Sequence, residues 1–231
     1  MHRTTRLRPR AIHSWAVTPT EAVQIQRALA GRVRRRGSLG AVRLVAGCDA
    51  AFSSDGGACV AGVVVWDTRL RSVVEQRVVR GMVRFPYVPG LLSFREIPAL
   101  FQAVAELRCR PEVFLFDGQG YAHPRRFGLA SHAGVLLDRP AVGCAKSILV
   151  GACEDPDVAR GATAPLTDRG EQIGMAVRTR HGVKPVYVSV GHKVSLAAAV
   201  RLVLQCCTGF RLPEPIRLAD RLVAAEKART A

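Results

Sequence analysis

The chain has 231 residues, with 34 lysines and arginines against 18 aspartates and glutamates, so its formal net charge is +16. No apolar run approaches the roughly 18–20 residues that cross a bilayer, which excludes a membrane-spanning protein. A charge of this sign and size favours a polyanionic partner such as nucleic acid, although an arginine-rich composition can also reflect a bias of the whole genome. We expect one soluble, cytoplasmic domain that acts as a monomer and does not bind membranes.

The seven cysteines are odd in number and show no Cys-x-x-Cys spacing. They predict reduced, buried thiols of a cytosolic protein rather than disulfides or a zinc site. Residues 1–17 contain several arginines, no acidic residue and no apolar segment typical of a secretory signal. We expect these residues to form a disordered basic arm, with a transit peptide as the alternative, ahead of a single domain over residues 18–231.

The first predicted helix begins at Thr18, because Thr18-Pro19-Thr20-Glu21 is a capping box with proline at the first helical position. Three arginines at 34–36 and then Gly37 predict its end. Three strand-like segments follow over 42–51, 58–66 and 73–79, and turn residues between them predict an antiparallel meander. Asp49 lies near the end of the first of these strands.

Two prolines in residues 85–90 predict a stiff loop that presents Tyr87. The next helix runs to about residue 107, and it starts either at a Ser93–Glu96 capping box or near Pro98. The remaining predicted elements are a buried strand over 113–116, a helix over 126–137, a strand over 140–146, a surface excursion over 151–168, a hairpin of 171–179 with 184–190, and helices over 195–207 and 215–227. This order predicts a mixed α/β sheet with helices on both faces.

Three acidic residues stand at the ends of apolar elements: Asp49, Glu96 and Asp117. If they converge, their mutual repulsion requires a cation, and carboxylate oxygens with open positions suit Mg²⁺, with Mn²⁺ as a substitute. Such an ion would activate water toward a phosphodiester. Each acid also has a plain structural interpretation: Asp49 as a turn cap, Glu96 as a capping-box partner and Asp117 as a helix N-cap.

Four other side chains suit phosphodiester hydrolysis, although each has a structural alternative. Lys146 ends a buried strand and would neutralise phosphate charge or orient water, or else it is a surface lysine. His192 is a candidate metal ligand or acid–base group, or a polar loop residue. His123 would contact phosphate or hold its loop, and Tyr87 would stack on bases or anchor its loop.

The chain contains, in this order, the motifs Gly47-Cys48-Asp49, Pro86-Tyr87-Val88-Pro89-Gly90 running into Phe94-Arg95-Glu96, Asp117-Gly118-x-Gly120-x-x-His123-Pro124-Arg125, Gly128-Leu129-Ala130-Ser131-His132, Gly143-Cys144-Ala145-Lys146 and Gly191-His192-Lys193. With these motifs the chain resembles the endonuclease V family of deoxyinosine-specific repair nucleases. The motifs occur in the family's order over residues 18–225, whereas residues 155–165 and the basic arm have no counterpart.

The resemblance implies an RNase H-like fold and a metal site of Asp49, Glu96, Asp117 and His192, with Lys146 as a catalytic lysine. It also implies a strand-separating wedge and a hypoxanthine pocket. The residues expected to contact substrate are Pro86, Tyr87, Val88, Pro89, Gly90, Leu92, Gly118, Gly120, His123, Arg125 and Leu129.

The activity implied is hydrolysis of the second phosphodiester bond 3′ to deoxyinosine in DNA, leaving a 3′-hydroxyl and a 5′-phosphate. One alternative is a ribonuclease for inosine-containing RNA, because contacts to a 2′-hydroxyl cannot be identified in the sequence. Another is a basic nucleic-acid-binding protein without catalysis, which would need none of the three acids.

Overall fold

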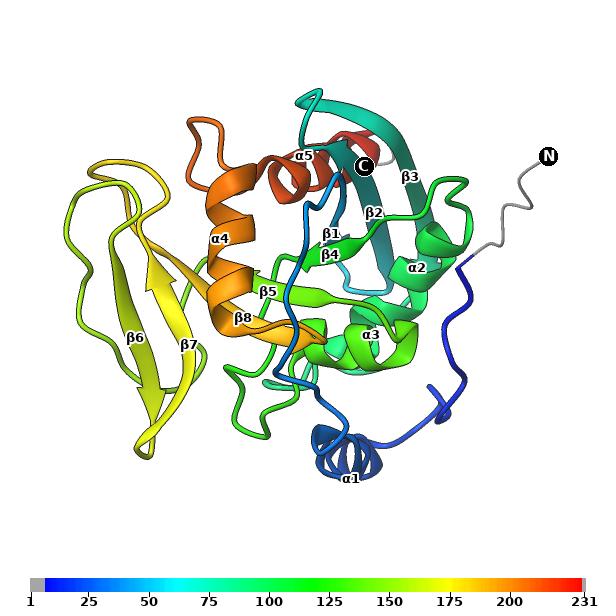
Figure 1. Ribbon diagram of the computed structural model, residues 1–231. Helices are drawn as coiled ribbons and strands as arrows, with labels where there is room; N and C mark the ends of the chain where they lie inside the picture. The colour runs from blue at the N-terminus through cyan, green and yellow to red at the C-terminus, as the bar shows by residue number, and fades with distance from the viewer. Residues whose placement is uncertain (1–6, 230–231) are drawn as a thin grey trace.

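The computed structural model of the protein describes residues 7–229. Its helices are α1 (Pro19–Ala30), α2 (Ser93–Ala105), α3 (Leu129–Leu137), α4 (Leu196–Cys206) and α5 (Glu214–Ala228). Its strands are β1 (Leu44–Phe52), β2 (Ala58–Asp67), β3 (Ser72–Met82), β4 (Val113–Phe116), β5 (Ala141–Ala145), β6 (Thr163–Asp168), β7 (Glu171–Val177) and β8 (Val186–His192). The strands form one sheet in the order β3-β2-β1-β4-β5-β8-β7-β6 (Figure 1).

The sheet is mixed, as predicted. Strands β1, β2 and β3 form the expected antiparallel meander, whereas β4 pairs in parallel with both β1 and β5. Parallel pairing places the carboxyl ends of β1, β4 and β5 at the same edge of the sheet. This edge therefore collects the residues that follow each of the three strands, and Asp117 and Lys146 are two of them.

Successive side chains of the central strands point to opposite faces of the sheet, and this divides the core into two layers. In β4, Phe114 and Phe116 pack with α2 and α3 on one face, and Val113 and Leu115 pack with α4 and α5 on the other. All four side chains are nearly inaccessible to solvent, as a strand covered on both faces requires. Helix α1 lies outside these two layers and contacts α3, at the lower edge of the view in Figure 1.

Three sequence predictions about local structure were wrong. Helix α1 ends at Ala30 with Gly31 as its C-cap, well before Arg34–Arg36. Gly37 does have a positive φ, of 141°, but there it lets the chain pass close to the Lys193 carbonyl, which a Cβ would approach to 2.7 Å. Strand β6 lies within the expected surface excursion, and with β7 it forms the hairpin that projects on the left of Figure 1.

The expected basic arm begins in residues 1–6, which lie outside the described part of the chain. From residue 7 onward the segment packs on the domain instead of being disordered. Leu7 is buried in the core, the Arg10 backbone N–H donates to the Leu136 carbonyl, and His13 Nε2 lies 2.7 Å from Nε2 of the buried His132. The apolar residues of this segment outweigh its arginines in deciding its position.

The seven cysteines are all free, and five of them are buried. Burial raises the pKa of every one of these thiols, to about 12 at Cys59 and Cys109. The other two, Cys109 and Cys153, are only partly buried, in contrast to the prediction that the thiols are buried. Residues 7–229 include no helix with the length and hydropathy to span a membrane.

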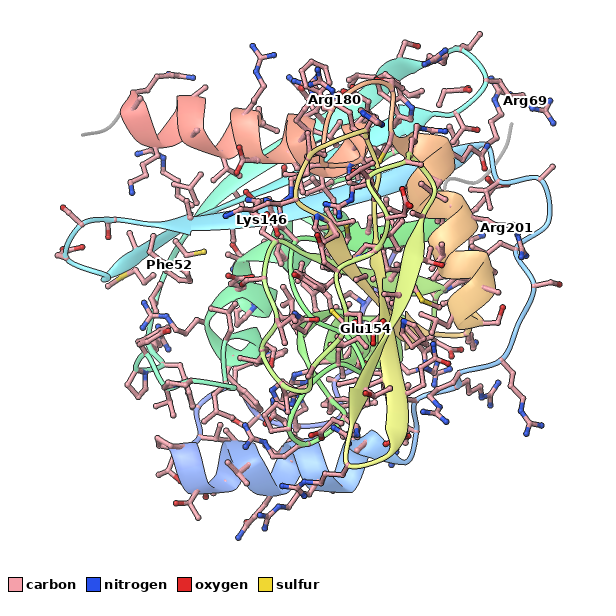
Figure 2. The ribbon with its side chains drawn as sticks, turned by 90° about the vertical axis from the view of Figure 1, so that its left-hand side faces the viewer. Phe52, Arg69, Lys146, Glu154, Arg180 and Arg201 are labelled. Atoms are coloured by element: carbon pink, nitrogen blue, oxygen red, sulfur yellow. The ribbon has the colours of Figure 1, made fainter. Side chains whose placement is uncertain are left out.

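Some of the basic residues are exposed to solvent. Arg69, Arg180 and Arg201 are examples, and they are labelled in Figure 2.

Candidate active site

Two of the three predicted acids meet because their strands are parallel neighbours. Cys48 of β1 is paired with Phe116 of β4, and the Asp117 backbone N–H donates to the Cys48 carbonyl at 3.1 Å. The residues that follow this pair therefore lie at the same level, Asp49 within β1 and Asp117 directly after β4. Both emerge on the face that α5 covers, because their predecessors Cys48 and Phe116 point into the opposite layer.

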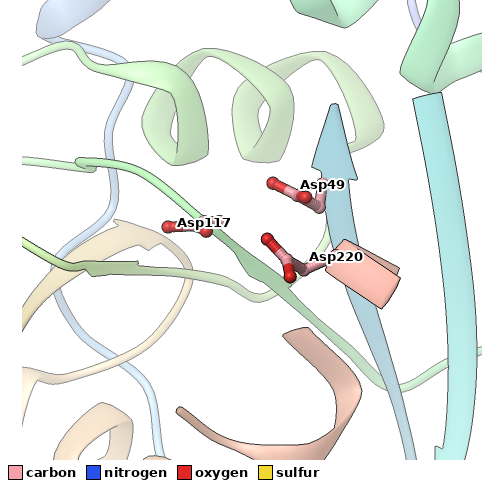
Figure 3. A group of neighbouring side chains, drawn as sticks. All are labelled: Asp49, Asp117 and Asp220. Atoms are coloured by element: carbon pink, nitrogen blue, oxygen red, sulfur yellow. The ribbon is translucent and has the colours of Figure 1, made fainter. Parts of the chain in front are cut away.

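The third member of the cluster is Asp220 of α5, which the sequence analysis did not identify. One carboxylate oxygen from each of Asp49, Asp117 and Asp220 lies within 4.8 Å of the others (Figure 3). Helix α5 reaches this position because Gly47 of β1 has no side chain, and a Cβ there would lie 2.1 Å from the Pro215 backbone. A signal for Asp220 existed: it is next to Ala219 on the buried stripe formed by Ile216, Ala219 and Val223.

Lys146 supplies the cation nearest to the cluster. It follows β5, and its Nζ lies 2.6 Å from Asp117 Oδ2 and 3.5 Å from Asp220 Oδ1 (Lys146 is labelled in Figure 2). Burial alone would lower the pKa of this ammonium, but the hydrogen bond to Asp117 and the charges of the acids raise it. Lys146 is therefore charged at neutral pH and directed into the acidic cleft.

Glu96 stands beside the three aspartates rather than among them. It lies in the first turn of α2, is 6% exposed and lines the same cleft as Asp49, Asp117 and Asp220. Its predicted capping box does not form, since the helix has no side-chain cap and Ser93 Oγ instead hydrogen-bonds His132 Nδ1 at 3.0 Å. The Glu96 carboxyl group is therefore available to the cleft.

Burial and, after it, mutual repulsion shift the titration of these acids. Burial, followed by the charge of Asp117, raises the pKa of Asp49 to about 7. Burial and the charges of Asp49 and Asp117 raise the pKa of Glu96 well above its usual range, and burial also raises that of Asp117 against its bond to Lys146. A group of hard oxygen donors that resist ionisation together fits a hard divalent cation, which would favour their charged forms.

A pocket of about 370 Å³ lies next to the acidic cleft. Eight of the eleven predicted substrate-binding residues line it: Tyr87, Val88, Pro89, Gly90, Leu92, Gly118, His123 and Leu129. Its volume is in the range of small-molecule sites. Its lining also includes the exposed side chains of Ile148 and Leu149.

The other three predicted substrate-binding residues lie outside this lining. Pro86 is exposed on the loop, and Gly120 is buried against β8, where a Cβ would come within 2.3 Å of the Val190 carbonyl. The absence of a side chain at Gly120 therefore allows close packing against β8. Arg125 donates from Nη2 to the Gly90 carbonyl at 2.8 Å, so it contacts a residue of the pocket without lining the pocket itself.

His123 is engaged by its own loop on both ring nitrogens. Its Nε2 donates to the Gly90 carbonyl at 2.9 Å, and its Nδ1 accepts from the Arg125 backbone N–H at 3.2 Å. Burial lowers the pKa of His123 to about 4, so the ring is neutral at pH 7. This arrangement supports the loop-holding alternative and leaves no ring nitrogen free for an acid–base step.

The prediction that His192 binds metal with the acids was wrong. In the sheet His192 pairs with Ala141, at the first residue of β5, whereas Lys146 and the acids lie beyond the last. The His192 ring is 3% exposed; its Nδ1 accepts from the Arg34 backbone N–H at 3.3 Å, and its Nε2 lies 3.6 Å from Asp138 Oδ1. His192 therefore holds the segment after α1 against β8, and Asp220, not His192, lies beside Asp49 and Asp117.

The comparisons with known proteins identify the family. A sequence model of the endonuclease V family matches residues 27–221. The chain belongs to the endonuclease V family. Endonuclease V of Roseiflexus sp. (strain RS-1) is 49% identical over 210 residues, covering 91% of this chain and 94% of the relative.

Solved endonuclease V structures share the fold along the whole domain. That of Streptomyces avermitilis has a TM-score of 0.89 at 43% identity, covering 98% of this chain and 100% of that one. That of Ciona intestinalis, in complex with a 24mer DNA containing an inosine followed by a ribo-adenosine, has a TM-score of 0.81 at 30% identity, covering 92% and 98%. The RNase H-like fold and the assignment as a nuclease are thereby confirmed.

Proposed function

We propose that this protein is a metal-dependent DNA repair endonuclease that recognises deoxyinosine and hydrolyses the second phosphodiester bond 3′ to it, leaving a 3′-hydroxyl and a 5′-phosphate. One observation carries the proposal: Asp117 and Lys146 line both the pocket and the acidic cleft. A base in the pocket and a phosphodiester in the cleft would therefore belong to one nucleic-acid strand.

The pocket suits a purine base that has been turned out of the stack. Its walls include Gly90 and Gly118, where backbone groups can approach the edges of a base at hydrogen-bonding distance. The Tyr87 side chain at its rim is 71% exposed, which is unusual for an aromatic residue of a soluble domain. We assign Tyr87 and its neighbouring prolines the role of a wedge that occupies the space left by the base.

The acidic cleft supplies the hydrolytic groups. Asp49, Asp117 and Asp220 would hold Mg²⁺, or Mn²⁺ in its place, with Glu96 beside them. When bound, such an ion polarises a phosphate and lowers the pKa of bound water. Lys146, already charged and directed into the cleft, would neutralise the charge that develops on the phosphate.

The net charge of +16 and the Ciona intestinalis structure with inosine-containing DNA both support nucleic acid as the partner. In that DNA the inosine is followed by a ribonucleotide, so a ribonuclease acting on inosine-containing RNA has to be measured alongside. Inosine-containing DNA and RNA of one sequence, assayed with the same enzyme, distinguish the two substrate classes.

The test is nicking of a duplex that contains one deoxyinosine, in the presence of Mg²⁺. We expect a single cut at the second phosphodiester 3′ to the lesion, and none in the same duplex with adenine. Asp117→Asn should remove cutting while the protein still binds the duplex. Equal cutting of both duplexes, or cutting that survives a chelator, would show that the proposal is wrong.

A further inference from the structure

The pocket has a buried support from α1, outside the residues that the sequence analysis connected with function. Gln26 of α1 is 1% exposed, and its side-chain amide reaches the back of the pocket. Its Nε2 donates to the Gly90 carbonyl at 3.0 Å and to the Phe127 carbonyl at 3.1 Å, and its Oε1 accepts from Arg125 Nε at 2.5 Å. Two acceptors and one donor fix which end of the amide is nitrogen.

The two carbonyls belong to two different segments of the pocket wall. Gly90 ends the wedge loop, and Phe127 precedes Gly128 and Leu129, which line the pocket on the side of α3. The two N–H groups of one Nε2 therefore connect these two segments. Since the amide is rigid and both hydrogen bonds have ordinary lengths, 3.0 and 3.1 Å, Gln26 holds the two carbonyls at a fixed separation.

The Gly90 end of this bridge is unusually well held. Leu91 N–H donates to the Val88 carbonyl at 3.0 Å, and Gly90 has a φ of 78°, so Val88–Leu91 form a type II turn with proline and glycine in their preferred places. The Gly90 carbonyl then accepts from Gln26 Nε2, His123 Nε2 and Arg125 Nη2. Three donors on an oxygen with two lone pairs leave this peptide little freedom to rotate.

We propose that Gln26 is a positioning residue for lesion recognition, which sets the width of the base pocket by tying the wedge turn to the Phe127–Leu129 wall. The inference rests on the proposed function, because it assigns the pocket to the deoxyinosine base. Gln26 itself touches no reacting atom. Its removal leaves the Gly90–Leu91 peptide held by His123 and Arg125 alone, and the Phe127 carbonyl without this donor.

The decisive variant is Gln26→Met, which keeps the length of the side chain and removes its three hydrogen bonds. Gln24→Met is the matched control, because Gln24 lies on the same helix with an exposed side chain. Steady-state nicking of a single-deoxyinosine oligonucleotide gives kcat and KM for each variant. Hydrogen–deuterium exchange of peptides covering residues 86–92 and 127–131 reports on the two walls independently of activity.

We expect Gln26→Met to raise KM about 10-fold, as the loss of a buried hydrogen-bonding group would, with a smaller change in kcat. Exchange should accelerate in both peptides and stay at the wild-type rate in Gln24→Met. A merely misfolded fraction would lower kcat and leave KM unchanged. The proposal is overturned if KM is unchanged, or if exchange accelerates in neither wall. Wild-type protein that fails to nick deoxyinosine would instead refute the proposed function, and exchange would still decide whether Gln26 joins the walls.

Discussion

The carboxylate of Asp49 should destabilise the fold whenever no cation is bound, and it should do so more strongly as the pH rises. Its pKa is raised to about 7 in the folded protein, against an ordinary value of 3.8. Between these values the folded state binds more protons than the unfolded state, so the free energy of unfolding falls as pH increases. Asp49→Asn removes the titration and keeps an oxygen that can accept the Ala50 backbone hydrogen bond.

The size of the effect follows from the two pKa values. At ~1.4 kcal/mol per unit of pKa difference, the raised pKa of Asp49 lowers the free energy of unfolding by about 4 kcal/mol at pH 8. At pH 5 the same pKa difference lowers it by only about 1.5–2 kcal/mol. The stability advantage of Asp49→Asn over the wild type should therefore shrink by roughly 2–3 kcal/mol between pH 8 and pH 5. In a domain of this size that difference corresponds to about 5–10 °C in Tm.

Urea unfolding of chelator-treated wild type and Asp49→Asn at pH 5, 6, 7 and 8 measures the difference directly. Glu154→Gln is the control, since Glu154 is an exposed acid distant in sequence from the cluster, and its unfolding should match the wild type at every pH. An Asp49→Asn advantage that is constant with pH, or a wild type that is the more stable at pH 8, would refute the electrostatic account of the cluster.

Three further outcomes follow from the site. Asp220→Asn should raise the Mg²⁺ concentration needed for half-maximal nicking by about 10-fold or more, and an unchanged metal titration would exclude it as a ligand. His192→Ala should leave that titration unchanged while lowering stability by about 1–3 kcal/mol, because the Arg34 N–H loses its acceptor. Tyr87→Ala should weaken binding of lesion-containing DNA by about 1–3 kcal/mol, and an equal loss on undamaged DNA would count against a wedge.

The parts of the fold that depend on local chemistry were predictable from sequence. Thr18 and Glu21 form the expected capping box, with the Thr18 N–H donating to Glu21 Oε2 at 2.7 Å. The end of β4 before Asp117 was also correct, because a charge that stops an apolar run marks the end of a buried strand, whereas β1 continues three residues past Asp49 to Phe52. Glu96 was predicted as one of the three acids of the site, with a capping-box role as the alternative; it lines the cleft with Asp49 and Asp117, and its helix has no side-chain cap.

The parts that depend on tertiary contacts were not predictable in the same way. Asp220 lies in the final helix, 103 residues after Asp117, and only the packing of α5 on β1 brings them together. The motif around His192 resembles the family's metal-binding motif. The register of β5 with β8 nevertheless places His192 at the end of the sheet opposite to the acids. Gln26 gives no signal in a helix of mixed polarity until Gly90 and Phe127 are brought beside it.

The suppressed ionisation of the native cysteines makes this protein well suited to site-specific labelling. Maleimides and iodoacetamides react with thiolates, and all seven native thiols have raised pKa values. A cysteine introduced at an exposed position just before the wedge loop, such as Arg84, should therefore react first, without removal of any native one. A fluorophore attached there would report in real time on whether the wedge enters the stack before or after the strand is cut.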